Sequence, residues 1–213
     1  MEPVVDPLKD LEATAKLYYE KDGPNQWPHI QRVKQQAEKL AKFRGKPLDL
    51  ADLAAVYFHD IGKREAGLQD HGEYAAQIAG PLLKPKLTKE QWKVAIEAIR
   101  THNTDAPSVN PTAELLRSAD ANVPDIAWFL RKSYNKMKAQ GMSNKDALSN
   151  ALRIAKKHIG TASQLKHRPK LYEKAFAAEI KQSDAMADRL TLNLANKLIQ
   201  KYNQEHPEES AYV

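Results

Sequence analysis

Apolar residues recur every three or four positions along most of the chain, the spacing of one face of an α-helix. No segment alternates apolar and polar residues as a strand would, and no hairpin signal is present. The first clear stripe runs from His29 to Arg44 and is ended by Gly45 and Pro47. The next, from about Asp49 to Ile61, is apolar on most sides, which predicts a buried central helix. We therefore expect an all-α fold.

The same periodicity continues in the middle of the chain. A helix is predicted from about His71 to Leu83, and Thr88 with Gln91 forms a capping-box pattern that opens another, ending at His102. A polar, proline-bearing loop over residues 103–111 follows. The helix that starts again beyond this loop is expected to be kinked or interrupted by Pro124.

The C-terminal third shows longer amphipathic stretches. One helix is predicted from Ser143, its cap, to Gly160, and a second from about Pro169 toward Tyr202. We expect these to form a helical extension. The chain then divides into a helical bundle over residues 1–140 and an extension over residues 141–213 that packs on the same domain.

Composition and charge narrow the class of protein. With 42% hydrophobic and 28% charged residues among 213, the chain is typical of a globular domain. No apolar stretch approaches the roughly 20 residues that span a bilayer, and the first residues lack the blocks of a signal peptide, so we expect a cytoplasmic protein without membrane contact. The net charge of +6 favours anionic ligands. Because the lysines are dispersed, specific nucleic-acid binding is possible but not favoured.

Side chains that can bind a metal fall on the core-facing stripes of five predicted helices. Asp60 lies four residues after Val56 and Asp120 four after Leu116, so each shares a helix face with an apolar residue. His59 directly precedes Asp60. The histidines on such stripes are His29, His71 and His102. Burying unpaired imidazoles and carboxylates costs on the order of a few kcal/mol or more each. A shared divalent cation is the natural partner, and without cysteine only imidazole and carboxylate can bind it.

The order of these residues resembles the H, HD, D pattern of the HD-domain superfamily. His29 comes first, the His-Asp doublet follows within the sequence FHDIGK at residues 58–63, and the last aspartate closes LLRSAD at residues 115–120. The resemblance covers about residues 25–130 and implies an HD-type helical bundle, with residues 1–140 as a metal-dependent catalytic domain. The metal ligands that it implies are His29, His59, Asp60 and Asp120.

Two further histidines bear on the number of ions. His71 and His102 resemble the additional histidines of binuclear family members, in which the aspartate of the doublet bridges both ions. His71 follows Asp60 at unusually short range. These histidines therefore either help to bind a second ion or contact the substrate phosphate. Ligation rich in imidazole favours a divalent transition metal, Mn, Fe, Co or Ni, as one or two ions.

Basic residues that can bind phosphate lie near the predicted ligands. Arg32, Lys63 and Arg117 are each three residues from a ligand on the same predicted helix. Lys63 matches the lysine that follows the doublet in many family members, and we expect it to act with Asp60 in catalysis and to contact the phosphate. Arg32, Arg64 and Arg117 are weaker candidates, because a solvated basic face explains them equally well.

The resemblance implies hydrolysis of a phosphomonoester or phosphoanhydride by water that the metal activates. Among phosphorylated small molecules, a nucleotide is the favoured substrate. Two alternatives stay open: a di-iron HD oxygenase, and a basic module that binds nucleotides or nucleic acid on an HD scaffold. Five inward polar residues argue against the binding module, which would not need them.

Overall fold

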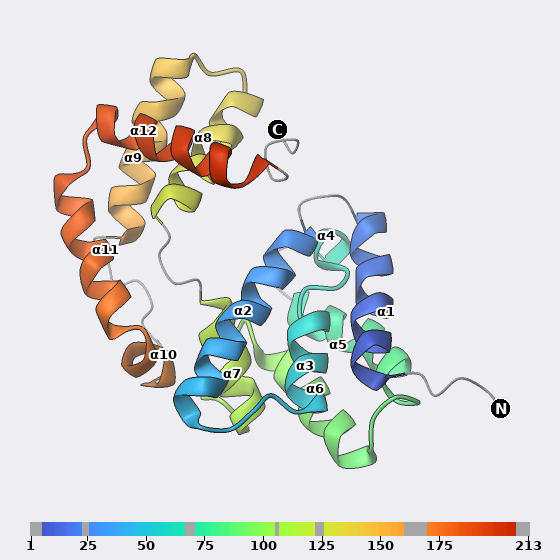
Figure 1. Ribbon diagram of the computed structural model, residues 1–213. Helices are drawn as coiled ribbons and strands as arrows, with labels where there is room; N and C mark the ends of the chain where they lie inside the picture. The colour runs from blue at the N-terminus through green and yellow to red at the C-terminus, as the bar shows by residue number, and fades with distance from the viewer. Residues whose placement is uncertain are drawn as a thin grey trace. The chain divides into compact units, whose positions relative to one another are not determined.

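The computed structural model describes residues 6–22, 26–66, 71–104, 107–121, 126–159 and 170–207. Within these ranges the chain forms helices and no strand, which confirms the all-α prediction (Figure 1). The chain splits into two compact units. Unit 1 comprises Met1–Ala121 with Pro169–Ala175, and unit 2 comprises Asn122–Arg168 with Phe176–Val213. The assignment of residues 1–140 as a catalytic domain stays a prediction.

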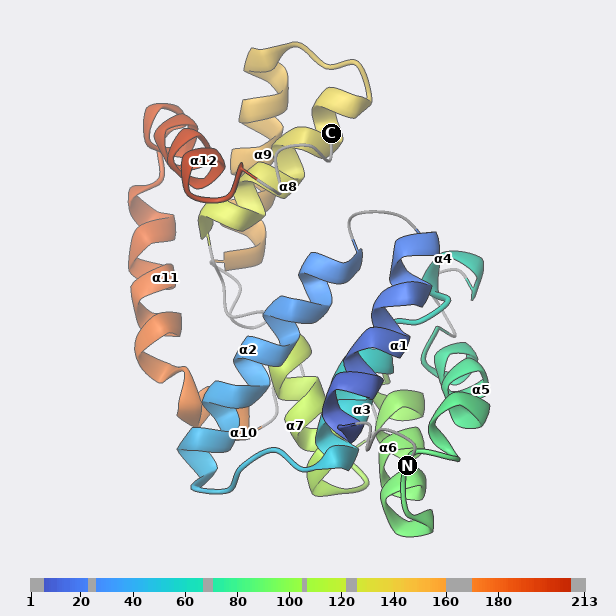
Figure 2. The same ribbon diagram turned by 45° about the vertical axis from the view of Figure 1, so that its right-hand side comes forward.

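Eight of the described helices belong to unit 1. They are α1 (Pro7–Asp22), α2 (Gln26–Arg44), α3 (Leu50–Phe58), α4 (Lys63–Ala66), α5 (His71–Leu83), α6 (Lys89–Thr101), α7 (Pro111–Asp120) and α10 (Lys170–Ala175). Helix α2 packs along α7, and α6 contacts α3, α5 and α7 (Figure 2). Helix α3 is buried from Ala51 to Phe58, which places it at the centre of this unit.

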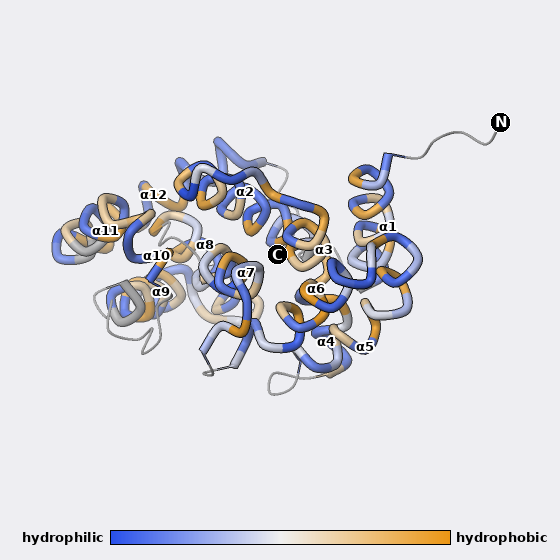
Figure 3. The backbone as a smooth tube through the Cα atoms, turned by 90° about the horizontal axis from the view of Figure 1, so that it is seen from below, coloured by the Kyte–Doolittle hydropathy of each residue, from blue (hydrophilic) through white to orange (hydrophobic). Residues whose placement is uncertain are grey.

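Amphipathic helices cover α3. Hydrophilic and hydrophobic residues alternate around α1 and α2, as the colours of Figure 3 show. The sequence pattern did not single out α1, because its fully buried stripe is short: Leu11, Ala15 and Tyr19. Helix α2 begins at Gln26, three residues before the predicted start at His29. Pro28 is tolerated in the first turn because backbone N–H groups there have no partner within the helix, so the N–H that proline lacks is not missed.

Helix α3 ends earlier than predicted, at Phe58 instead of Ile61. Residues 59–62 form a turn that Gly62 closes with a φ of 72°. A Cβ on Gly62 would lie 2.7 Å from Cε1 of Tyr74, closer than side chains tolerate. Both the left-handed backbone and this close approach therefore require glycine. The turn presents the His59-Asp60 doublet from a sharp bend rather than from a helix.

Several helix ends follow the predicted local signals. The described bounds of α5 are those expected. The capping box of α6 forms between Thr88 and Gln91. Asn110 caps α7 by accepting a hydrogen bond from the N–H of Ala113 at 2.8 Å. Of the other predicted boundary residues, Pro124, Gly160 and Pro169 lie outside the described residues, as does part of the loop over residues 103–111.

Unit 2 has its own hydrophobic core. Its described helices are α8 (Ile126–Ala139), α9 (Asn144–Ile159), α11 (Ala177–Arg189) and α12 (Leu192–Glu205). Ser143 caps α9 as expected, accepting a hydrogen bond from the N–H of Asp146 at 3.1 Å. The core of this unit consists of Ile126, Leu130, Ala155, Leu190, Ala195 and Ile199. No helix in the described part of the chain is both long and apolar enough to cross a membrane.

The prediction of a single helix from about Pro169 toward Tyr202 is wrong. The described chain forms three helices there, α10, α11 and α12. A turn at the buried Phe176 separates the first two. After the buried Leu190, the Thr191 side chain accepts a hydrogen bond from the N–H of Leu194 and starts α12. The breaks arise because these apolar residues pack into the core and a new N-cap competes with helix continuation.

Candidate metal centre

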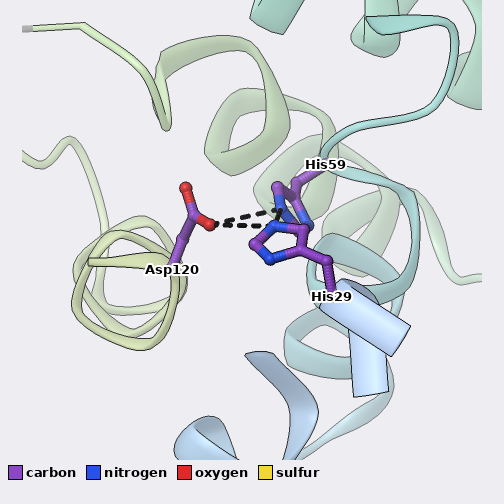
Figure 4. Close-up of side chains that lie close together, drawn as sticks. All are labelled: His29, His59 and Asp120. Carbon is purple, nitrogen blue, oxygen red and sulfur yellow. Dashed lines mark hydrogen bonds and ion pairs between the residues drawn. The ribbon is translucent and has the colours of Figure 1, made fainter. Parts of the chain in front are cut away.

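Unit 1 brings the four predicted ligands together from three segments. His29 lies on α2, His59 and Asp60 follow α3, and Asp120 is the last residue of α7. Nε2 of His29 lies 3.3 Å from Nε2 of His59. It is also 3.4 Å from Oδ2 of Asp60 and 3.2 Å from Oδ1 of Asp120. Figure 4 shows the Asp120 carboxylate pointing at the two imidazoles. These spacings place His29, His59 and Asp120 within reach of one ion, with Oδ2 of Asp60 beside the two imidazoles.

The two remaining histidines lie on the other side of Asp60. Nε2 of His71, at the start of α5, lies 3.1 Å from Nε2 of His102, which ends α6. Each of these nitrogens is 3.5 Å from Oδ1 of Asp60. The two carboxylate oxygens of Asp60 therefore face different histidine pairs, Oδ2 facing His29 and His59. Each oxygen of this carboxylate could therefore take part in holding a cation.

Backbone carbonyls orient two of the imidazoles. Nδ1 of His59 lies 2.9 Å from the carbonyl oxygen of Val56, and Nδ1 of His102 lies 2.7 Å from that of Ile99. A carbonyl oxygen only accepts hydrogen bonds, so each Nδ1 carries a proton and donates it. The Nε2 atoms consequently face the cluster, the arrangement in which a neutral histidine offers a lone pair to a metal.

Strong electrostatic coupling links the buried groups. Burial disfavours the charged form of His59, but the carboxylates of Asp60 and Asp120 outweigh it and raise its pKa to about 9. Burial likewise opposes ionisation of the two carboxyls. The imidazoles of His59 and His29 nevertheless hold the pKa of Asp60 and of Asp120 well below the usual range. At neutral pH the carboxylates are therefore charged and ready to bind a cation.

A buried carboxylate oxygen in the cluster indicates that a cation would fit there. Oδ1 of Asp60 is buried and has no hydrogen-bond partner in the described structure. A buried anionic oxygen left in this state is costly, whereas a divalent ion beside it would offset the charge. Unit 1 thus contains two candidate metal-binding groups, His29 with His59 and Asp120, and His59 with Asp60 and His102. Their mixed nitrogen and oxygen donors suit a divalent transition metal.

The four predicted ligands differ in how far their side chains are exposed. The side chains of His59 and Asp60 are 0% and 1% exposed, whereas those of His29 and Asp120 are 19% and 27% exposed. A cavity of about 630 Å³ lies elsewhere in unit 1, among α1, α2, α3 and residues 45–48, and no member of the cluster lines it. Of the four predicted ligands, His29 and Asp120 are therefore the two that are partly exposed to solvent.

The predicted phosphate-binding residues differ in their surroundings. Nζ of Lys63 lies 2.7 Å from Oδ2 of Asp60, which places its ammonium group directly at the cluster. Arg117 donates a hydrogen bond to the carbonyl oxygen of Thr104 at 2.6 Å and so ties α7 to the turn after α6. Arg32 is half-buried on α2, and Arg64 is exposed on α4.

Sequence reasoning missed two residues beside the cluster. Nδ2 of Asn103 lies 3.2 Å from Nδ1 of His71. A Cβ on Gly72 would lie 2.6 Å from the carbonyl oxygen of Arg100, so this glycine permits α5 and α6 to approach closely. The sequence offered one indication of their place beside the cluster: Asn103 directly follows His102, and Gly72 directly follows His71. Asn103 lies in a turn outside the helical stripes, and Gly72 lies on the buried stripe of α5 but has no side chain that would mark it as functional.

Comparison with known proteins gives one match. The family model described as HD domain matches residues 27–125. This range contains the whole cluster, from His29 to Asp120. No curated protein and no solved structure matches the chain significantly.

Proposed function

Because residues 27–125 of the chain are an HD domain, we propose that this protein is a metal-dependent phosphohydrolase. The observation that supports the proposal is the clustering of His29, His59 and Asp120, with Asp60 beside them and one oxygen of its buried carboxylate without a hydrogen-bond partner. These residues would hold the first ion. Manganese, iron, cobalt and nickel are the favoured metals, given the imidazole-rich donor set.

The residues around the ion have distinct roles in the proposed reaction. A bound divalent metal polarises a phosphoryl oxygen and lowers the pKa of the attacking water. Asp60 helps to orient that water as well as binding the ion. The Lys63 ammonium group lies beside Asp60 with its side chain 32% exposed, so it can contact the phosphate that enters from solvent. The positive charge of Lys63 offsets negative charge on the phosphate as the bond to the leaving group breaks.

The proposed substrate is a phosphomonoester or phosphoanhydride, with a nucleotide favoured. The net charge of +6 concentrates such anions near the protein. The solvent-accessible side of the cluster, past His29 and Asp120, can admit a phosphate group while His59 stays buried. Arg32, Arg64 and Arg117 remain weaker candidates for substrate contact.

Substitution of Asp60 tests the function. Metal content is measured on the purified protein, and phosphate release is followed over a panel of nucleotides under anaerobic conditions. We expect Asp60→Ala to lower turnover by at least about 100-fold, because the change removes a ligand and the carboxylate that orients water. Asp146→Ala, which removes an exposed carboxylate from unit 2, is the matched control and should leave turnover unchanged.

Circular dichroism of both variants checks that they fold. Undiminished phosphate release by Asp60→Ala would contradict the assigned site. Turnover that requires oxygen, with iron bound, would instead select the oxygenase.

A further inference from the structure

Basic and acidic residues are divided unequally between the two units. Unit 1 has 19 Lys and Arg and 19 Asp and Glu, so its formal charge is zero. Unit 2 has 14 Lys and Arg against eight Asp and Glu, and therefore carries the whole net charge of +6. The lysines are dispersed along the chain, but the acidic residues that would offset them are scarcer in unit 2.

The excess positive charge of unit 2 lies on the pair of helices α8 and α9. These helices pack side by side (Figure 1). Between Ile126 and Ile159 the sequence has eight Lys and Arg and one acidic residue, Asp146. Oδ2 of Asp146 accepts a hydrogen bond from Oγ of Ser143 at 2.6 Å at the start of α9. The helix pair therefore has a positive field that few charges of its own offset.

Three of these cations share one exposed face of α9, which we call the basic face. They are Lys145, Arg153 and Lys156. Their positions are eight and three residues apart, so the first and last are separated by almost exactly three helical turns. Another face of α9 holds the fully buried Ala147, Ala151 and Ala155. The basic face is therefore turned to solvent while the alanine face packs inside unit 2.

The cations of the basic face lack the acidic partners that cations in unit 1 have. In unit 1, Nζ of Lys34 lies 3.6 Å from Oε2 of Glu12, and Nε of Arg100 lies 2.7 Å from Oε2 of Glu73. Within the described part of the chain, no ion pair joins a member of the basic face to a carboxylate. The charge of this face is thus available to an anion from outside the protein.

An extended polyanion fits the basic face better than a membrane does. From Lys145 to Lys156 the helix rises by about 17 Å, which is the length of about five phosphates along one strand of DNA. A helix that lies on a bilayer presents large apolar side chains to the lipid. Among the described residues of α8 and α9, no large hydrophobic side chain is exposed. The surface therefore suits the phosphodiester backbone of a nucleic acid.

We infer that unit 2 binds nucleic acid through the basic face of α9. The contacts are to backbone phosphates, so binding depends little on base sequence. This function is separate from the hydrolysis proposed for unit 1, and it requires neither a metal nor turnover.

Fluorescence anisotropy measures the binding, with a labelled DNA duplex and a labelled RNA hairpin as the two probes. We expect the unmodified protein to bind at least one probe, and the affinity to fall as salt is added. Three phosphate contacts predict that log K falls by about 3 for each tenfold rise in salt. A preference between the probes distinguishes DNA from RNA as the source of the backbone. Absence of binding to both probes at low salt would overturn the inference.

Removal of the three cations tests where the nucleic acid binds. The variant carries Lys145→Gln, Arg153→Gln and Lys156→Gln, since glutamine keeps the helix propensity of the residues that it replaces. We expect it to bind the probe at least about 10-fold more weakly at low salt, and the salt dependence to be nearly lost. Circular dichroism of the variant checks that its helices form.

A matched variant removes the same charge from unit 1. It carries Lys39→Gln, Lys84→Gln and Lys93→Gln, three exposed lysines outside the proposed metal centre. We expect this variant to bind the probe like the unmodified protein, because these lysines do not contact the nucleic acid. Equal weakening in the two triple variants would show that net charge alone attracts the probe, and would refute the inference.

Two further outcomes would also refute a nucleic-acid site on α9. Unchanged affinity in the α9 variant would place the contact elsewhere on the protein. Tighter binding to phosphatidylcholine vesicles that contain phosphatidylserine than to either probe would make a membrane the partner. Failure of the proposed hydrolysis is a separate result, because it would appear as absence of phosphate release and leave the anisotropy measurements unaffected.

Discussion

His59 and Asp60 are neighbours in the sequence and both are almost completely buried, so each favours the charged form of the other. The Val56 carbonyl keeps a proton on Nδ1 of His59. The carboxylates of Asp60 and Asp120 raise the pKa of His59 to about 9, so the ring keeps a second proton at neutral pH. This second proton is on Nε2, which faces the cluster. An ion bound by His59 must replace that proton.

This coupling predicts a pH dependence for the metal-free protein. The folded pKa of His59, about 9, is above the unfolded value of about 6.5. The stabilisation is therefore complete below pH about 6.5 and is lost as the pH rises through about 9. We expect the free energy of unfolding, measured in urea, to fall by up to about 3 kcal/mol over this range. His59→Gln should remove this part of the dependence, and equal slopes for the two proteins would contradict the assignment.

At the scale of elements, the turn between α3 and α4 is the part of the site that we expect to tolerate substitution least. Gly62 has a φ of 72°, and Tyr74 and Ile78 of α5 pack against it. The turn carries the doublet, so its backbone position sets where both side chains meet α2 and α7. Gly45, at the end of α2, has a similar φ of 68° but nothing within 4 Å of a Cβ.

These two glycines allow a matched comparison. Gly45→Ala adds only the strain of a left-handed alanine, about 1–2 kcal/mol. Gly62→Ala adds the same strain plus overpacking against α5, for a loss of about 2–5 kcal/mol in unfolding free energy. Urea unfolding measures both, and calorimetry should show weaker metal binding in Gly62→Ala alone. Equal losses of stability in the two variants would rule out the steric contribution.

At the scale of the whole molecule, the chain leaves unit 1 after Ala121 and returns to it through α10. Helix α10 contacts α2 and α7, the helices that carry His29 and Asp120. Its Tyr172 side chain is 1% exposed. A segment far along the sequence therefore supports the helices that position two of the proposed ligands.

Core substitutions in the two units should have different effects on the metal centre. Tyr172→Ala should lower the unfolding free energy by about 3–5 kcal/mol and weaken metal binding, because α2 and α7 lose a packing partner. Ile199→Ala removes a buried side chain from the core of unit 2. We expect it to cost about 2–5 kcal/mol without changing the metal affinity. Calorimetric titrations of both folded variants decide this, and unchanged metal affinity in Tyr172→Ala would refute the role given to α10.

The sequence by itself determined what depends on neighbours along the chain. The all-α class, the bounds of α5 and the caps at Thr88 and Ser143 follow from periodicity and from hydrogen bonds within one helical turn. The sequence also predicted that the histidines and aspartates lie on the buried faces of their helices, because residues three or four apart share one face of a helix. Assignment of those residues to a metal stays a prediction that the experiments above test.

Only the tertiary structure decided how those residues meet. The division of the two Asp60 oxygens between separate histidine pairs, the contact of Asn103 with His71, and the return of α10 to unit 1 all join distant segments. Their geometry comes from close approaches such as the one at Gly72, which no periodicity encodes. Local patterns specify which face of a helix is buried, whereas the packing of helices specifies which atoms that face will touch.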